Sequence, residues 1–185
     1  HSCPTRRSSD LSVATNDGGS VVPIQIATAI YDGAAPLQKQ TQLKYDGYYN
    51  VVESDESDYY PCSGIPCAAA TNPPSWLRKT FTNYLWSSPN PTQPSYSYSQ
   101  AHIVDKPSQV TVTDGSGNPA SMVQYNYDEF PLSGSTGILN HDDANYPATM
   151  VGPRGNLTSE KDCLTFSGSN CASWNPPTTY RYDLA

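Results

Sequence analysis

The residues whose types and order come closest to a metal-binding or catalytic group are His141, Asp142 and Asp143. An imidazole beside two carboxylates can hold a metal ion that activates water for hydrolysis. Three consecutive residues rarely converge on one ion, however, and further ligands would have to come from His1 or His102. We therefore interpret this tripeptide as an exposed turn and predict no catalytic residue, no cofactor and no metal site.

The acidic run from Glu53 to Asp58 is a second group of candidate ligands, because carboxylates and hydroxyls are the oxygen ligands that Ca²⁺ prefers. The run lacks the glycine and the terminal bidentate glutamate of a calcium loop, and successive side chains of a strand face opposite sides of the sheet. We interpret it as a solvated, charged edge strand that blocks aggregation.

The five cysteines indicate disulfide chemistry. Cys62 and Cys67 bracket a short loop that holds a glycine and a proline, and Cys163 and Cys171 bracket a second loop with a glycine at its bend. We predict these two local disulfides, each stabilising the fold by about 2–3 kcal/mol for a loop of this size. Cys3 is then left over, either free or linked to another chain. This cysteine usage favours export to the cell surface or the extracellular medium.

A tyrosine–aspartate pair recurs beside Gly-Asn turns, and internal repeats determine architecture. The aspartate can accept hydrogen bonds from the amides of its own turn, and glycine supplies the positive φ that closes a hairpin. The residues of this motif are Tyr45, Asp46, Tyr127, Asp128, Gly155, Asn156, Tyr182 and Asp183, with looser copies at 31–33 and 114–118. Each copy predicts one β-hairpin with tyrosines on one face, and hairpins in series would bury these tyrosine belts against one another.

Residues 41–185 resemble the bacterial RHS (YD-repeat) proteins, whose copies read Tyr-x-Tyr-Asp-x-x-Gly-Asn-Leu-Thr. Residues 180–183 carry the first half of that motif and residues 154–158 the second half. Segments similar to 106–118 and 141–146 also occur in long members of the family. The resemblance implies a spiral β-sheet, often a hollow shell around a cargo, and a role outside enzymology.

Composition also predicts an all-β protein. The 17 prolines and 12 glycines disfavour long helices, and only 36% of the residues are hydrophobic. The core must then come mostly from 14 tyrosines, 3 tryptophans and the valine, isoleucine and alanine positions. Composition alone leaves a disordered chain as the alternative. A net charge of −7 argues against a nucleic-acid partner, and no stretch has the apolar length of a membrane span.

We predict that the chain is divided into two parts, whose strands position these motifs. Residues 1–40 form a polar N-terminal arm followed by a strand over 21–30, which has Pro23 near its start or on an edge. Residues 41–185 form a single RHS-like unit of stacked antiparallel β-hairpins with long Pro/Ser/Gly-rich loops. The expected hairpins cover 37–52 and 103–127, and further strands cover 75–86, 156–166 and 178–183.

The predicted function is that of a non-enzymatic extracellular structural protein, a β-repeat segment that forms a wall or fibre. The sequence stops within a repeat, so we expect a piece of a longer precursor whose terminal strands pair with other copies of the chain into a filament. The alternative is a carbohydrate-binding or adhesion module whose glycan partners stack on exposed aromatic rings. Those rings are Trp76, Trp86, Trp174, Tyr96 and Tyr98.

Asn156-Leu157-Thr158 is also an Asn-x-Thr sequon, so Asn156 is a candidate for N-glycosylation. The repeat turn explains the same three residues without any modification. The Ser/Pro-rich stretch 87–99 is a further candidate for O-linked sugar.

Overall fold

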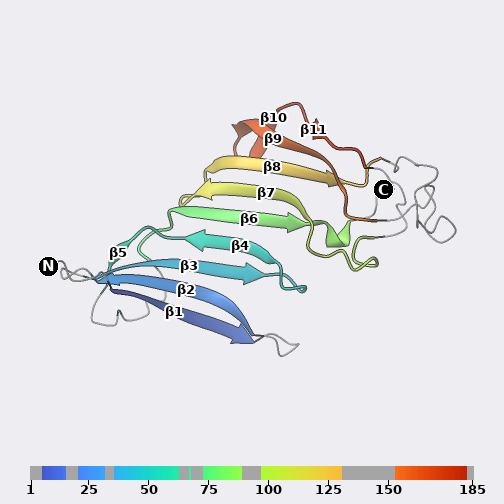
Figure 1. The fold of residues 1–185 in the computed structure, drawn as a ribbon. Helices are drawn as coiled ribbons and strands as arrows, with labels where there is room; N and C mark the ends of the chain where they lie inside the picture. Colours follow the sequence, from blue (N-terminus) through green and yellow to red (C-terminus); the bar gives the residue numbers. More distant parts are fainter. Residues whose placement is uncertain are drawn as a thin grey trace. The chain divides into compact units, whose positions relative to one another are not determined.

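The computed structural model describes residues 6–15, 21–31, 36–62, 67, 73–88, 97–130 and 153–182, with the backbone alone at 6–15, Val21 and Ser87. These residues form β-strands and one three-residue 3₁₀ helix, which confirms the all-β fold (Figure 1). The elements are β1 (Arg6–Thr15), β2 (Val21–Tyr31), β3 (Leu37–Tyr45), β4 (Val51–Glu56), β5 (Tyr60–Pro61), β6 (Arg78–Tyr84), η1 (Leu85–Ser87), β7 (Pro107–Asp114), β8 (Pro119–Tyr127), β9 (Leu157–Ser167), β10 (Asn170–Trp174) and β11 (Thr178–Thr179).

One compact unit comprises residues 1–81 and 111–120. Its strand order is β1-β2-β3-β4-β6-β7-β8, with the parts of β6, β7 and β8 that fall in these ranges, and β5 pairs with β3. In β2 the register shifts where Pro23 pairs with Val13 and Gln25 with Ser12. This bulge accommodates the proline, which has no N–H to donate to a ladder.

The second compact unit comprises residues 82–110 and 121–185. Its strand order is β6-β7-β8-β9-β10, again with only the parts of β6, β7 and β8 inside these ranges, and β11 pairs with β9. The β8–β9 and β9–β10 pairs are antiparallel, and each contains an irregularity in register. Such shifts bend and twist a strand locally.

The hairpins predicted from the sequence are present as β3–β4 and β7–β8, and β6 and β9 fall almost entirely within their predicted ranges. Strand β1 differs, because it lies in the stretch expected to be a polar arm. Its backbone pairs with β2 from Arg6↔Tyr31 to Thr15↔Val21. The polar sequence of β1 carries no strand signal of its own, so pairing with the β-branched strand β2 determines its conformation. The expected boundary at residue 40 falls inside β3.

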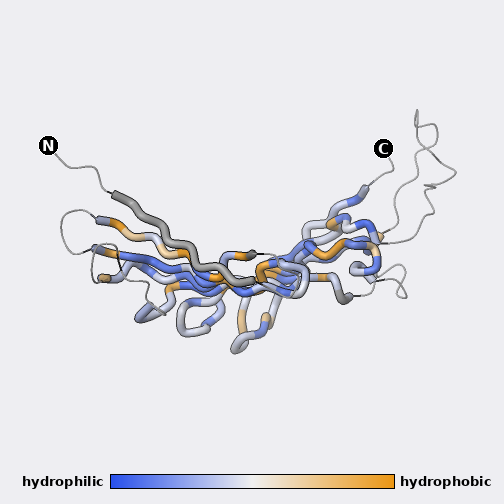
Figure 2. The backbone as a smooth tube through the Cα atoms, turned by 90° about the horizontal axis from the view of Figure 1, so that it is seen from below, coloured by the Kyte–Doolittle hydropathy of each residue, from blue (hydrophilic) through white to orange (hydrophobic). Residues whose placement is uncertain are grey.

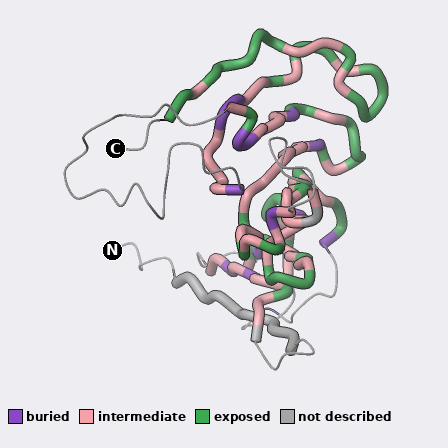
Figure 3. Tube along the Cα trace, turned by 90° about the vertical axis from the view of Figure 1, so that its right-hand side faces the viewer, coloured by how far each residue is buried: buried purple, intermediate pink, exposed green. Residues whose placement is uncertain are grey.

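Burial is scattered along the strands rather than collected in one block, and hydrophilic residues run through most of them (Figures 2 and 3). The buried hydrophobic residues are Ala27, Ala29, Cys67, Tyr98, Met122 and Tyr127, and the buried polar ones are Gln38, Gln40, Asp55, Ser57, Thr113, Asp128, Thr158 and Ser159. Tyrosine belts therefore do not form the core as expected. Tyr48, Tyr49 and Tyr59, which lie in connections between strands, are exposed.

Tyr98 is the most deeply buried aromatic residue of the described chain, with 1% of its surface exposed. Its hydroxyl donates to the Tyr127 carbonyl at 3.1 Å, and its own carbonyl accepts the amides of Ala101 and Ile103. The ring and these backbone bonds fix the connection between η1 and β7 against the end of β8.

We expect Tyr98→Ala to lower the free energy of unfolding by about 3–5 kcal/mol, because it deletes a buried ring and leaves a cavity. Tyr98→Phe should cost only about 1 kcal/mol, since it removes one hydrogen bond to a carbonyl. Chemical denaturation of both variants measures the difference. Equal losses would show that the ring itself does not stabilise this part of the sheet.

Candidate functional site

Three turns share one arrangement of an aspartate and an asparagine, and we name them Asp–Asn turns. The first is 46–50, the second is 114–118, and the third is formed by Asp128 with residues 154–156. In each, the aspartate amide donates to the asparagine carbonyl, at 3.0, 2.9 and 3.0 Å respectively. In each, the asparagine amide donates to the aspartate Oδ1, at 3.0, 2.9 and 3.1 Å. The carboxylate thus closes the turn from inside, as the sequence motif predicted.

In the first two turns the asparagine side chain adds a further bond. Asn50 Nδ2 donates to Asp46 Oδ2 at 2.9 Å, and Asn118 Nδ2 donates to Asp114 Oδ2 at 2.8 Å. Hydrogen bonds to the charged form of a carboxyl favour ionisation. The Asn118 side chain, followed by backbone amides of the turn, accordingly holds the pKa of the Asp114 carboxyl below its usual value.

The residue before the asparagine has a left-handed backbone in all three turns. Its φ is 67° at Tyr49, 91° at Gly117 and 74° at Gly155. Glycine adopts this conformation at little cost, whereas a residue with a Cβ is strained there. The Gly-Asn pattern of the sequence is therefore a conformational requirement, and the first turn meets it with a tyrosine.

The third turn closes over a large gap in sequence. Asp128 Oδ2 accepts the amides of Arg154 and Gly155, each at 2.9 Å, and Asp128 itself has a φ of 54°. The structure therefore joins the two half-motifs that stand apart in the sequence, at Tyr127-Asp128 and Gly155-Asn156, into one turn.

Glu129 reinforces this turn, and sequence reasoning did not identify it. Its Oε2 accepts the Ser159 hydroxyl at 2.7 Å and lies 3.0 Å from Thr158 Oγ1, while its amide donates to Thr158 Oγ1 at 3.3 Å. Thr158 and Ser159 are buried at the start of β9. Thr158 Oγ1 also lies 3.1 Å from the Asn126 carbonyl oxygen, and Ser159 Oγ accepts Asn126 Nδ2 at 3.0 Å. The carboxylate therefore adds one more partner for hydroxyls that burial removes from water.

Tyr127 precedes the third turn and is buried. Burial, with smaller contributions from Tyr125, Asp105 and Glu160, raises the pKa of Tyr127 to about 12. The ring is thus neutral and packed, and it supports the turn from the sheet. In the first turn Tyr45 has a comparable supporting role, since its hydroxyl donates to the Pro23 carbonyl at 2.7 Å.

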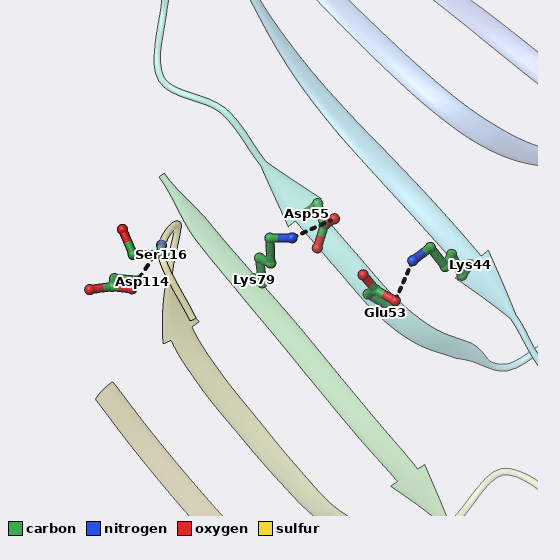
Figure 4. A network of polar contacts seen from close by, with 6 residues as sticks. All are labelled: Lys44, Glu53, Asp55, Lys79, Asp114 and Ser116. Carbon is green, nitrogen blue, oxygen red and sulfur yellow. Dashed lines mark hydrogen bonds and ion pairs between the residues drawn. The ribbon is translucent and has the colours of Figure 1, made fainter. Parts of the chain in front are cut away.

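A row of charges lies on one face of β3, β4 and β6 (Figure 4). Lys44 Nζ is 2.6 Å from Glu53 Oε2, and Lys79 Nζ is 3.6 Å from Asp55 Oδ2. The strand registers place both pairs directly opposite each other. The interpretation of the acidic run as an edge strand is therefore wrong, because β4 pairs on both sides and basic residues of its neighbours offset its charge.

The negative charge of Asp55 is only partly compensated by the other residues of this row. The residue is 5% exposed, and its Oδ1 accepts no hydrogen bond from the part of the chain that the structure describes. Burial raises the pKa of the Asp55 carboxyl, Glu53 raises it further, and Lys79 opposes both. The ionised carboxylate at neutral pH therefore reduces the stability of the folded state.

Both predicted cysteine pairs lie at disulfide distance. The Cα atoms of Cys62 and Cys67 are 5.5 Å apart, and those of Cys163 and Cys171 are 5.7 Å apart. The first pair is also anchored to β2, because the Cys67 amide donates to the Tyr31 hydroxyl at 2.9 Å.

Several predicted residues stand apart from these turns. Tyr182 is exposed beyond β11, while Asp183, Cys3, Tyr96 and the His141–Asp143 tripeptide lie outside the described residues. No group of three or more potential metal ligands occurs in the described ranges. Glycosylation of Asn156 stays a prediction, since the contacts described for that residue involve its backbone.

Tyr98 cannot stack on a sugar, because the ring is buried, so this part of the carbohydrate-binding alternative is wrong. Trp76, Trp86 and Trp174 are half-buried rather than fully exposed. The Lys161 ammonium lies 4.7 Å from the ring centre of Trp174, so a cation already occupies one face of that ring.

The chain matches no protein-family model, and comparisons with curated proteins and with solved structures also gave no match. The resemblance to RHS proteins thus rests on the motif residues themselves. Across the ranges that the structure describes, no helix has the length and apolar character needed to cross a membrane.

We expect Tyr49→Gly to raise the free energy of unfolding by up to about 1 kcal/mol, because it relieves a left-handed backbone. Gly117→Ala, at the corresponding position of the second turn, should lower it by about 1 kcal/mol for the same reason. Urea denaturation of the two variants tests the pair. Shifts of the same sign in both would contradict a shared conformational requirement.

We expect Asp55→Asn to stabilise the protein at neutral pH and to lose this advantage in acid. The folded-state pKa of Asp55 lies above its unfolded value, so its contribution is most favourable at low pH and declines as the pH rises through the folded pKa. Denaturation across this pH range measures the effect. Glu56→Gln is the control, since Glu56 lies on the same strand as Asp55 but forms an exposed ion pair, with Arg78 of β6. A gain for Glu56→Gln that matches Asp55→Asn would rule out burial as the cause.

Proposed function

We propose that this chain is a non-enzymatic structural segment, a β-repeat of RHS type that forms part of an extracellular wall or fibre. The observation that carries the proposal is the recurrence of one Asp–Asn turn at three places, with the same backbone and carboxylate contacts. A repeated self-closing turn lets a sheet extend strand by strand without a single large apolar core.

The distribution of polar residues supports this role. Eight buried polar residues stand beside six buried hydrophobic ones in the described chain, and charge pairs cross between neighbouring strands. Specificity of pairing in such a sheet comes from hydrogen bonds and from opposite charges in register. The acidic balance of the sequence keeps an extended surface soluble.

Extracellular location is part of the proposal and is supported by the two cysteine pairs at disulfide distance. Disulfides persist in oxidising compartments and are rare in the cytosol. Each pair closes a short loop, which stabilises a local connection rather than joining distant parts of the chain.

The proposed partner is a second copy of the same chain. In the strand order of the described residues β1 pairs with β2 alone, so its other edge carries backbone donors and acceptors that another strand can use. Edge pairing of this kind adds strands in series and produces a fibre unless the rotation closes a ring.

We expect the purified chain to form concentration-dependent species larger than the monomer at micromolar concentration. Sedimentation velocity and negative-stain imaging detect these species. Two proline variants of β1, Ser8→Pro and Ser9→Pro, form a matched pair, because successive amides of a strand point to opposite edges. One variant should weaken the pairing with β2, and the other should reduce assembly while the unfolding transition stays close to that of the wild type. A single monomeric species without fibres would contradict the proposed assembly.

A further inference from the structure

The first and second Asp–Asn turns both begin with an Asp-Gly step, Asp46-Gly47 and Asp114-Gly115. At such a step the backbone nitrogen of the glycine can attack Cγ of the aspartate, because no side chain hinders its approach. The nitrogen bonds to Cγ, and the protonated carboxyl group loses its hydroxyl, which leaves with the amide proton as water. Water then opens the resulting ring. When it breaks the bond between the nitrogen and the original backbone carbonyl carbon, the product is isoaspartate, with one extra methylene in the main chain.

The two turns hold their carboxylates in the same way. Asp46 Oδ1 accepts the amides of the second and fourth residues after it, at 2.8 and 3.0 Å, and Asp114 Oδ1 accepts the corresponding amides, each at 2.9 Å. Hydrogen bonds of this kind favour the ionised carboxylate, whereas ring closure needs the protonated carboxyl group. The carboxylate contacts therefore slow the reaction at both steps, and a difference between the steps has to come from their surroundings.

The glycines of the two steps have different surroundings. Gly47 is exposed, and a Cβ built on it would meet no atom within 4 Å. Gly115 is half-buried, and a Cβ built on it would overlap the carbonyl oxygen of Trp76. Ring closure requires the peptide unit before the glycine to rotate until its nitrogen faces Cγ, and this rotation displaces the glycine. The first turn leaves room for the movement, whereas the backbone of Trp76 obstructs it in the second.

The first turn is also the easier of the two to open. Tyr49 has a φ of 67°, and the corresponding residue of the second turn, Gly117, has a φ of 91°. A residue with a Cβ is strained in this region, and glycine is not. Opening of the first turn relieves this strain, so the open conformations that precede ring closure are more populated there.

We infer that Asp46 is a site of spontaneous conversion to isoaspartate and that Asp114, in the matching turn, is protected from it. The reaction releases one water molecule and takes one up, and it needs no enzyme. The extra methylene changes the spacing between the carboxylate of residue 46 and the amides that it binds. The hairpin of β3 and β4 is therefore the part of the sheet that loosens first as the protein ages.

The first arm of the test incubates the folded protein in neutral buffer and follows isoaspartate by tryptic peptide mapping with electron-transfer fragmentation. Trypsin places Asp46 in peptide 45–78 and Asp114 in peptide 80–154. The Asp-Gly steps 17–18 and 32–33, which lie outside the described residues, fall in another peptide. We expect isoaspartate to form about fivefold faster at Asp46 than at Asp114, or more. Equal rates at the two sites, or a faster rate at Asp114, would overturn the inference.

The second arm repeats the incubation in concentrated urea, which removes both turns. We expect Asp46 and Asp114 to convert at similar rates there, because both are then flexible Asp-Gly steps. A difference between the sites that persists unchanged in urea would assign the effect to local sequence rather than to the fold. Absence of isoaspartate at Asp46 in the folded protein, over a period in which the urea sample converts, would also overturn the inference.

The variant Gly47→Ala checks the assignment of the site. We expect an unfolding transition close to that of the wild type, since the added Cβ meets no atom within 4 Å, together with loss of most of the isoaspartate from peptide 45–78. Conversion in that peptide at the wild-type rate would place the reaction at another residue. These measurements follow a covalent change in a single chain, so their outcome is separate from whether the chain assembles.

Discussion

The acceptance of backbone amides by an aspartate carboxylate is the interaction on which this structure depends most. A hairpin needs its strands held in one register, and a turn of ordinary composition leaves amide groups without partners. In the Asp–Asn turns the carboxylate binds those amides directly, and hydrogen bonds to a charged acceptor are stronger than neutral ones. The left-handed residue before the asparagine then directs the backbone amide of the asparagine toward the carboxylate. In the first two turns these contacts join residues at most four positions apart, so those turns form without help from a distant core.

This local closure explains how the sheet tolerates so much polar burial. The described core contains small or aromatic residues such as Ala27 and Tyr98, but also Gln38 and Thr158. A polar residue costs free energy when buried unless it is bonded, and most of these have partners on an adjacent strand, such as the Tyr60 hydroxyl for Gln38. Asp55 Oδ1 and Thr113 Oγ1 are among the exceptions, because neither makes a hydrogen bond within the described chain. Glu53 raises the pKa of the Asp55 carboxyl and Lys79 lowers it. The residue therefore contributes more to the specificity of strand register than to stability.

The same turn geometry underlies the proposed function. A sheet held by repeated turns can lengthen by adding hairpins, and its turns lie at strand ends, where solvent is near. At the third turn Asp128 has a left-handed φ, and its carboxylate accepts the amides of Arg154 and Gly155. The repetition of this one turn geometry is the basis on which we propose a structural wall. The close approach of Gly115 to the Trp76 carbonyl shows that packing as well as the motif constrains the second turn.

The sequence by itself determined the all-β class, the hairpins around 46–50 and 114–118, and the two cysteine pairs, because each depends on residues close together in the chain. Proline density, Asp and Gly-Asn spacing, and short Cys–Cys loops are local signals of that kind. Only the tertiary structure decided that β1 is a strand, that β4 is interior, and that Asp128 closes a turn with Asn156. It also decided that Glu129 supports that turn and that Tyr98 is core rather than platform. These features depend on partners far apart in sequence, and strand pairing and burial are properties of those partners, so no local pattern encodes them.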